Sequence, residues 1–309
     1  MRRPRPELAA AALVAAFALV AGWNAYKYPS GGGYDARQHR EYADLLIHHG
    51  ELPGPETRSE YYTPPFFYAL AGAATVLGEQ VHSGDPHKLA QVLNWLVLVA
   101  TAGVVWLLAR ELFPGRVWLQ LSALAFFCFL PVVLRVGAMF HPEPLSMLLT
   151  AVALLLAARM LGRPDHRWQL AVACGLALGL GQLVRAFSLW TFAAVVLAFA
   201  VARAWRPLAV VVVATAVVAS PWYIRQAIEY GDPVFDRPQP SEAIWDRRPA
   251  SFYVGLGLPD VLTEPRRPNF VNKALPTTYS EVWGDYFVVW RGSREIQNLL
   301  GLLPTLLAV

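Results

Sequence analysis

Long apolar runs separated by short polar connections dominate the chain. A helix that spans a membrane needs about 20 mostly apolar residues, whereas a helix of a soluble bundle carries a polar stripe at helical spacing. The runs in this chain are apolar on every face, and several are close to the short limit. They predict an all-α, polytopic membrane protein rather than a soluble bundle. The predicted spans are residues 8–23, 89–109, 117–134, 145–158, 170–184, 189–202 and 208–222.

The composition agrees with this interpretation. Charged residues make up 16% of the chain, well below the roughly 25% of soluble domains. The net charge is +4, but most arginines lie at the ends of apolar runs, so we expect them to set membrane orientation and expect no nucleic-acid partner. Cys128 and Cys174 lie inside apolar runs without metal-ligand spacing, which is typical of small core residues.

The N-terminus has two interpretations. Arg2, Arg3 and Arg5 precede the first apolar run, which is also the pattern of a cleaved signal peptide. A retained first span is favoured, because this run is long and six further runs follow it.

The arginines predict an orientation, because cytoplasmic loops of membrane proteins are enriched in Lys and Arg. The short turns on one side hold only Arg135 and Arg185. The N-terminus and the connections on the other side hold Arg2, Arg3, Arg5, Arg110, Arg116, Arg159, Arg163, Arg167, Arg203 and Arg206. This bias assigns the N-terminus to the cytoplasm and the loops 24–88 and 226–295 to the outer face.

The apolar piece 65–77 cannot be a simple crossing under this assignment. The run 89–109 has to pass from outside to inside to place the basic connection after it in the cytoplasm. Because the piece 65–77 is short and begins at Pro64-Pro65, we expect an interfacial or re-entrant helix on the outer side.

The loop 24–88 carries candidate chemistry. After three glycines at 31–33, Asp35, His39 and Tyr42 follow at helical spacing and share one face of a helix. One explanation of Asp35 is a helix N-cap after a glycine hinge, and the other is a functional acid; the residues leave both open.

A second acid, Glu143, lies between two prolines at the outer end of a predicted span. Acids are favoured, and proline is tolerated, in the first turn of a helix, which is one explanation. The other is a cavity shared with Asp35, since carboxylates at membrane depth tend to mark functional sites. The outer arginines either snorkel to lipid headgroups or bind an anionic group such as phosphate; they are Arg135, Arg185 and Arg225.

Short motifs follow one another in a defined order. They are Gly33-Tyr34-Asp35 with His39 and Tyr42, Thr63-Pro64-Pro65-Phe66-Phe67-Tyr68, Ala109-Arg110-Glu111-Leu112-Phe113, His141-Pro142-Glu143-Pro144-Leu145, Pro221-Trp222-Tyr223-Ile224-Arg225 and Tyr230-Gly231-Asp232-Pro233. In this order they resemble the GT-C class of membrane glycosyltransferases, and most closely the branch of protein O-mannosyltransferases and lipid A aminoarabinose transferases. The resemblance extends over nearly the whole chain.

The resemblance implies a GT-C-like helical bundle with juxtamembrane helices in the first outer loop. It also implies transfer of a sugar from a polyprenyl-phosphate carrier to an acceptor hydroxyl or amine on the outer face of the cytoplasmic membrane. Asp35 matches the family's first-loop acid, the catalytic base, and Glu143 matches its second acid. The residues that we expect to bind substrate are His39, Tyr42, Tyr62, Pro65, Arg185, Arg225, Lys88 and Arg135.

No metal or other cofactor is required by these residues, although Asp35, His141 and Glu143 leave room for a divalent cation. Two alternatives to an enzyme stay open. One is a flippase or transporter of a lipid-linked saccharide, which would be expected to show internal repeats; the other is an inactive membrane remnant that binds the lipid carrier. The residues do not specify the sugar, the carrier length or the acceptor.

We expect one transmembrane domain over 1–309. Relatives of this class are usually longer, and the apolar run from Ile296 could begin a further span that the chain does not complete. A truncated C-terminus is therefore expected.

Overall fold

The computed structural model describes residues 6–54, 60–82, 84–162, 168–233, 249–268, 273–290, 296–303 and 306. Within these residues, the regular secondary structure is helical and there is no strand. The predicted all-α class is confirmed. The chain divides into two compact units, the first containing 1–128 and 136–237 and the second containing 129–135 and 238–309. The single domain expected over 1–309 stays a prediction.

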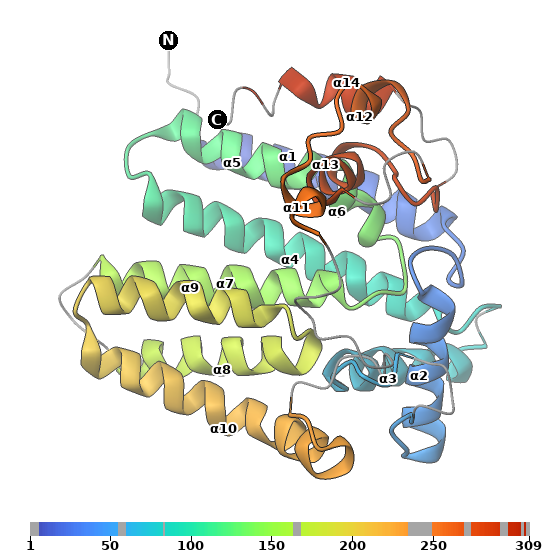
Figure 1. Cartoon of the computed structure of the whole chain (residues 1–309), viewed down its shortest axis with the longest axis horizontal. Coiled ribbons are helices and arrows are strands. Elements are labelled where there is room, and N and C mark those ends of the chain that lie inside the picture. The colour runs from blue at the N-terminus through green and yellow to red at the C-terminus, as the bar shows by residue number, and fades with distance from the viewer. Residues whose placement is uncertain are drawn as a thin grey trace. The chain divides into compact units, whose positions relative to one another are not determined.

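Each unit has its own set of helices (Figure 1). Those of the first unit are α1 Pro6–Lys27, α2 Ala36–His49, α3 Phe66–Gln80, α4 Lys88–Leu112, α5 Val117–Phe129, α7 Glu143–Leu161, α8 Trp168–Val184, α9 Ser188–Val201 and α10 Trp205–Tyr230. Those of the second are α6 Pro131–Val136, α11 Ala250–Val254, α12 Asp260–Thr263, α13 Ala274–Trp283 and α14 Ile296–Leu300.

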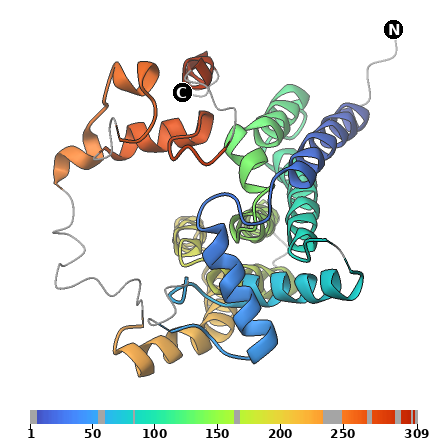
Figure 2. The ribbon, with the colours of Figure 1, turned by 90° about the vertical axis from the view of Figure 1, so that its right-hand side faces the viewer.

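Seven helices of the first unit correspond to the predicted apolar runs. Four of them, α1, α4, α7 and α10, are long and apolar enough to cross a membrane, and α5, α8 and α9 are shorter apolar helices. They run in broadly one direction in Figure 1, and α7, α8 and α9 are seen nearly end-on in Figure 2. The polytopic membrane architecture is confirmed. In the region of the last apolar run, the described residues include the short helix α14.

Small residues set the core of this bundle. Helix α8 packs between α7 and α10, and α4 packs on α7. Gly175 and Gly179 share the face of α8 that meets α10, where a Cβ atom would lie 2.6 Å from the Cβ of Ala214 and of Val218 respectively. Glycine spacing of this kind lets two helix backbones approach closely in a membrane.

Helices α2 and α3 lie across one end of the bundle rather than along it (Figure 2). They pack on each other, and α3 also contacts α4 and α8. Helix α3 begins directly after Pro64-Pro65, with Pro65 as its N-cap residue. Proline is disfavoured inside a helix but is well tolerated at its start. The juxtamembrane helices expected in the first loop are confirmed.

Arginines gather at the opposite end of the same bundle. Each lies in the terminal turn of an apolar helix, or next to it, at the end away from α2 and α3, and they are Arg110, Arg116, Arg159, Arg203 and Arg206. Arg2, Arg3, Arg5, Arg163 and Arg167 from the charge argument lie outside the described residues.

Polar side chains of α4 hold the turn that leads into α7. Gln91 donates to the carbonyl of Ala138 at 2.6 Å, and the Asn94 amide donates to the carbonyls of Met139 and His141 at 2.9 Å each. These bonds satisfy buried main-chain acceptors. They also fix the position of His141, two residues before Glu143.

The second unit is small. Val261 and Tyr286 form its buried apolar centre, and Asn298 donates to the carbonyl of Val261 at 2.9 Å. Arg135 pairs with Glu281 at 2.9 Å and donates a further short hydrogen bond to its carbonyl.

Candidate active site

The residue that begins α2 is in an unusual state. Asp35 has a φ of 44° and a ψ of 20°, in the left-handed region, and makes no side-chain cap hydrogen bond. Few residues other than glycine adopt this conformation, although Asp is enriched among them. Its carboxylate is exposed. Of the two explanations for Asp35, side-chain capping of α2 is therefore not the one that the structure supports.

The glycine before this turn has a steric role. Gly33 has a φ of 110°, and a Cβ atom there would lie 2.6 Å from the sulfur of Met139. Only glycine combines this backbone conformation with such a close approach. The loop before Asp35 is thus pressed against the turn before α7.

The buried face of α2 meets aromatic residues of α3. His39 and Tyr42 are fully buried, and the ring of Tyr42 stacks on that of Tyr68 at 3.8 Å between centroids. His39 Nδ1 lies 2.9 Å from the Tyr68 hydroxyl. That hydroxyl also lies 2.8 Å from Thr63 Oγ1, so the motif around Pro64-Pro65 is bonded directly to α2.

His141 brings the two acid-bearing segments together. Its ring lies perpendicular to that of His39 with centroids 4.7 Å apart, and edge-on to Tyr34 at 6.1 Å. Tyr34 precedes Asp35, and His141 is two residues before Glu143. The first loop and the segment before α7 are therefore in contact, while the cavity expected between Asp35 and Glu143 stays a prediction.

Glu143 is paired with a cation. Arg185, which follows α8, donates from Nε and from Nη2 to one oxygen of Glu143, at 2.9 and 2.8 Å. Burial lowers the pKa of the Arg185 guanidinium, but Glu143, Tyr68 and Glu60 together raise it by more, so the net shift is upward. The pair thus supplies a permanent positive charge beside a carboxylate.

Burial keeps the two histidines of this cluster neutral. Desolvation, with a smaller contribution from the Arg185 charge, lowers the pKa of His39 to about 3. Desolvation also lowers the pKa of His141 well below its usual value, and His39 and Arg185 add to this effect. At neutral pH both rings act only as hydrogen-bonding groups.

The model of the dolichyl-phosphate-mannose-protein mannosyltransferase family matches residues 63–224, just over half of the chain. The chain belongs to this family. The matched range contains Thr63, Tyr68, His141, Glu143 and Arg185, so most of the cluster lies inside it. The predicted resemblance to the GT-C class is confirmed.

A solved structure shares the fold. The crystal structure of ArnT from Cupriavidus metallidurans bound to undecaprenyl phosphate matches with a TM-score of 0.50 and 22% sequence identity, over 72% of this chain. The match covers 42% of the ArnT chain, so this chain spans less than half the length of that relative. A comparison with curated proteins finds no match.

Four other residues of the first unit were also expected to bind substrate, and their surroundings differ. Tyr42 lies inside it, and Pro65 begins α3 beside it. Tyr62 makes an edge-on contact with Tyr61 at 5.6 Å. Arg225, on α10, pairs with Glu229 at 2.6 Å, and its charge still reaches Tyr42.

Two of the expected substrate-binding cations are engaged elsewhere. Lys88 Nζ donates to the carbonyls of Ala25 at 3.0 Å and Tyr26 at 3.2 Å, and makes a shorter bond to Tyr28. An ammonium has three protons to donate, so Lys88 acts as a cap for the end of α1. Arg135 belongs to the second unit. Its expected role in substrate binding stays a prediction.

Sequence reasoning missed part of the cluster. Thr63 and Tyr68 appeared only as part of a motif, and Glu60 and Asn94 were not considered. Glu60 is buried, and its charge reaches both Arg185 and Tyr68. Buried polar residues beside a Pro-Pro element and within an apolar run were the available signal, since such groups need partners.

The structure gives no support for the cation that Asp35, His141 and Glu143 left room for. Among the described residues, no group of three or more His, Cys, Asp or Glu side chains is arranged to hold a metal ion. The absence of a cofactor requirement stays a prediction.

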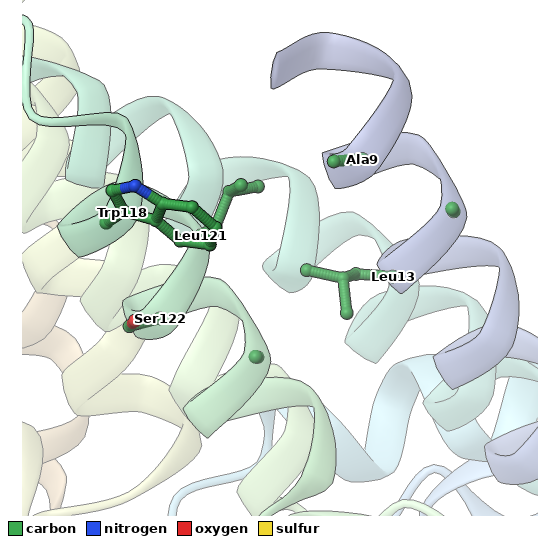
Figure 3. A pocket seen from close by; sticks show the side chains of 7 residues that line it. Ala9, Leu13, Trp118, Leu121 and Ser122 are labelled. Carbon is green, nitrogen blue, oxygen red and sulfur yellow. The ribbon is translucent and has the colours of Figure 1, made fainter. Parts of the chain in front are cut away.

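A cavity of about 510 Å³ lies apart from this cluster (Figure 3). It opens between the first turns of α1, at Ala9 and Leu13, and of α5, at Trp118 and Leu121. These residues are at the end of the bundle away from α2. The cavity therefore does not belong to the candidate active site.

Proposed function

We propose that the protein transfers a sugar from a polyprenyl-phosphate-linked donor to an acceptor hydroxyl or amine on the outer face of the cytoplasmic membrane. The observation that carries this proposal is the gathering of Asp35, His39, His141 and the Glu143–Arg185 pair at one end of the bundle. Family membership and the fold shared with ArnT support it.

The sidedness rests on the arginines. Those at the ends of α4, α7 and α9 and at the starts of α5 and α10 lie away from α2. Because basic residues are retained in the cytoplasm, the opposite end, with the candidate active site, is assigned to the outer face. A reporter fused within residues 113–116 should read out as cytoplasmic, and an external readout would contradict this orientation.

In the proposed reaction, the acceptor oxygen or nitrogen bonds to the anomeric carbon while the bond from that carbon to the phosphate oxygen breaks. The acceptor proton passes to the Asp35 carboxylate, and the electron pair leaves with the polyprenyl phosphate. A carboxylate is too weak a base to remove the proton of a hydroxyl or amine before the new bond begins to form. The proton transfer therefore has to be concerted with bond formation.

Arg185 is the group best placed to stabilise the departing phosphate. Its guanidinium is held by Glu143 and has its charge fixed before the reaction begins. Preorganised charge of this kind is among the largest contributions to catalysis. In this arrangement Glu143 acts as a positioning residue for Arg185, while its expected role as a second catalytic acid stays a prediction.

The first test is Asp35→Asn, which keeps the size of the side chain and removes the base. We expect sugar transfer to fall by about 10²- to 10⁴-fold, the usual contribution of a general base, with unchanged membrane insertion. The assay is the release of free polyprenyl phosphate from a radiolabelled polyprenyl-phosphate sugar by the chain in proteoliposomes.

Glu41→Gln is the matched control. Glu41 is on the helix that Asp35 precedes, has a side chain 52% exposed and, among the described residues, makes a single charge contact, with Arg37 at 4.0 Å, so transfer should be unchanged. Retained transfer in the Asp35→Asn variant would contradict the proposed role of Asp35. Translocation of the lipid-linked sugar without transfer would favour the flippase instead.

A further inference from the structure

A chain of hydrogen bonds runs through the candidate active site and ends on a main-chain carbonyl. Thr63 Oγ1 donates to the carbonyl of Glu60 at 2.6 Å. The Tyr68 hydroxyl lies 2.8 Å from Thr63 Oγ1, and His39 Nδ1 lies 2.9 Å from the Tyr68 hydroxyl. All four residues are buried, so each bond is made in a low-dielectric environment.

The end of this chain fixes the direction of every bond. A carbonyl can only accept, so the single proton of Thr63 is used on Glu60. Thr63 must then accept the single proton of Tyr68. The Tyr68 oxygen is left as an acceptor, and His39 Nδ1 must donate to it.

His39 is thereby held in one tautomer. A neutral imidazole carries one proton, and here that proton is on Nδ1. His39 Nε2 consequently presents a lone pair. No hydrogen bond from another described residue occupies it.

His141 has the opposite tautomer. The main-chain N–H of Glu143 points to His141 Nδ1 at 3.4 Å, and an N–H group can only donate. His141 Nδ1 is therefore unprotonated, and the proton is on Nε2. Asn94 fixes the segment by its bonds to the carbonyls of Met139 and His141.

The two rings form a complementary pair. They are perpendicular, with centroids 4.7 Å apart, and one offers an acceptor at Nε2 while the other offers a donor at Nε2. Burial, together with the positive charge of Arg185, disfavours the protonated form of both. The hydrogen-bonding character of the pair is therefore set by the fold and not by ambient pH.

We propose that His39 and His141 recognise a neutral hydroxyl group of the donor sugar, with His39 Nε2 accepting its proton and His141 Nε2–H donating to its oxygen. This inference rests on the proposed function. A hydroxyl both donates and accepts, so it satisfies both nitrogens. An ammonium group only donates; it would leave the His141 N–H unpaired and would lie close to Arg185. The site therefore selects a neutral sugar hydroxyl over an amino substituent at this position.

The tautomers can be tested without any assay of activity. In the chain labelled with ¹⁵N-histidine and reconstituted in nanodiscs, ¹⁵N chemical shifts should place the proton of His39 on Nδ1 and that of His141 on Nε2. Both should stay neutral between pH 5 and 8. A His39 proton on Nε2, or a charged ring at pH 6, would overturn the inference.

Tyr68→Phe tests whether the chain of hydrogen bonds sets the tautomer of His39. It removes the acceptor of the His39 Nδ1 proton, so signals of the other His39 tautomer should appear. Tyr42→Phe is the matched control, because Tyr42 stacks on Tyr68 and donates to the carbonyl of Thr63 but is not part of the chain. An unchanged His39 tautomer in Tyr68→Phe would show that the chain does not set it.

Recognition is tested with two probes, undecaprenyl phosphate carrying a neutral hexose and the same carrier carrying an amino sugar. We expect the neutral sugar to shift the ¹⁵N signal of His39 Nε2 and to bind about tenfold more tightly or better, since an unpaired buried donor is costly. His39→Asn should abolish this preference. His39→Gln, whose amide oxygen can reach the Nε2 position, should restore part of it. Equal binding of the two probes would overturn the inference.

The outcome is distinguishable from failure of the proposed function. If the chain bound the neutral-sugar probe more tightly but transferred no sugar, the proposed enzymatic function would be contradicted and the proposed recognition would stand. Transfer without preference would contradict only the recognition by His39 and His141.

Discussion

Two regions of the first unit bury side chains by different means. Between α7, α8, α9 and α10, the core is made of small and aliphatic residues such as Ala153, Cys174 and Val211, and helices approach through glycine. At the end covered by α2 and α3, buried residues include His39, Glu60 and Asn94. The first region is stabilised mainly by close packing, with few hydrogen bonds between helices such as that from Thr215 to the carbonyl of Gly175, whereas the second depends on its buried polar groups having partners.

The strained backbone of the first loop lies in the second of these regions. The left-handed conformation of Asp35 and the glycine-only turn at Gly33 lie beside the polar cluster. Strained residues persist only where their surroundings hold them, and they are frequent at functional sites. The polar end is thus where substitutions should affect activity most, and the apolar core is where they should affect stability alone.

Among substitutions that should change both stability and transfer, the largest effect is expected at the ion pair. Arg185→Ala leaves the half-buried Glu143 without its partner, which should cost about 1–3 kcal/mol of stability and reduce transfer about 10²-fold through the lost charge. Thermal unfolding in detergent and the transfer assay measure the two effects. Arg159→Ala is the matched control, because Arg159 contacts Glu111 at 3.7 Å at the other end of the bundle; an equal loss of transfer there would contradict the assignment.

Glycine substitutions should separate the two regions next. Gly179→Ala places a methyl group 2.6 Å from Val218 and should cost about 1–3 kcal/mol by overpacking, with normal transfer from the folded fraction. Gly103→Ala is its control: nothing lies within 4 Å of a Cβ there, so a gain of up to about 1 kcal/mol is expected from helix propensity. Similar unfolding temperatures for both variants would contradict the proposed role of the α8–α10 contact.

Acidification should weaken the polar region selectively. The pKa of His39 is lowered from 6.5 to about 3, so the unfolded state binds more protons between these values and stability falls as pH falls through this window. Between pH 7 and pH 5 the loss from His39 alone is about 2 kcal/mol. Hydrogen exchange of α2 at the two pH values measures it. The His39→Asn variant should lose the share that comes from His39, whereas the share from His141, whose pKa is also lowered, should remain.

The smallest effect is expected on the exposed face of α2. Glu41→Gln changes a solvated side chain and should alter stability by less than about 0.5 kcal/mol. A larger change in the unfolding temperature would show that this face has a partner that the charge pattern does not reveal.

The pattern of apolar runs was sufficient for most of the fold. It located the seven apolar helices. The charge bias also predicted that α3 does not cross the membrane, and this stays a prediction. The boundary between α5 and α6 was not predicted. The apolar run 117–134 was interpreted as one span, but α5 ends at Phe129 and α6 begins at Pro131. Proline has no N–H for the preceding turn and divides the run there.

The candidate site was only partly predictable. Helical spacing placed His39 and Tyr42 on one face, and a charge between prolines drew attention to Glu143. Lys88 has the same charge as Arg185, and no local pattern distinguishes a cation that caps α1 from one that pairs with Glu143. Their difference depends on which helix ends meet.

The sequence by itself thus determined the class of the protein, its spans and the segments that carry its acids, because hydrophobic periodicity and the preference of charges for helix ends are local properties. Only the tertiary structure decided that His39 bonds Tyr68, that Arg185 bonds Glu143 and that two histidines adopt opposite tautomers. These pairings join residues far apart in the chain, and their geometry follows from how the helices pack.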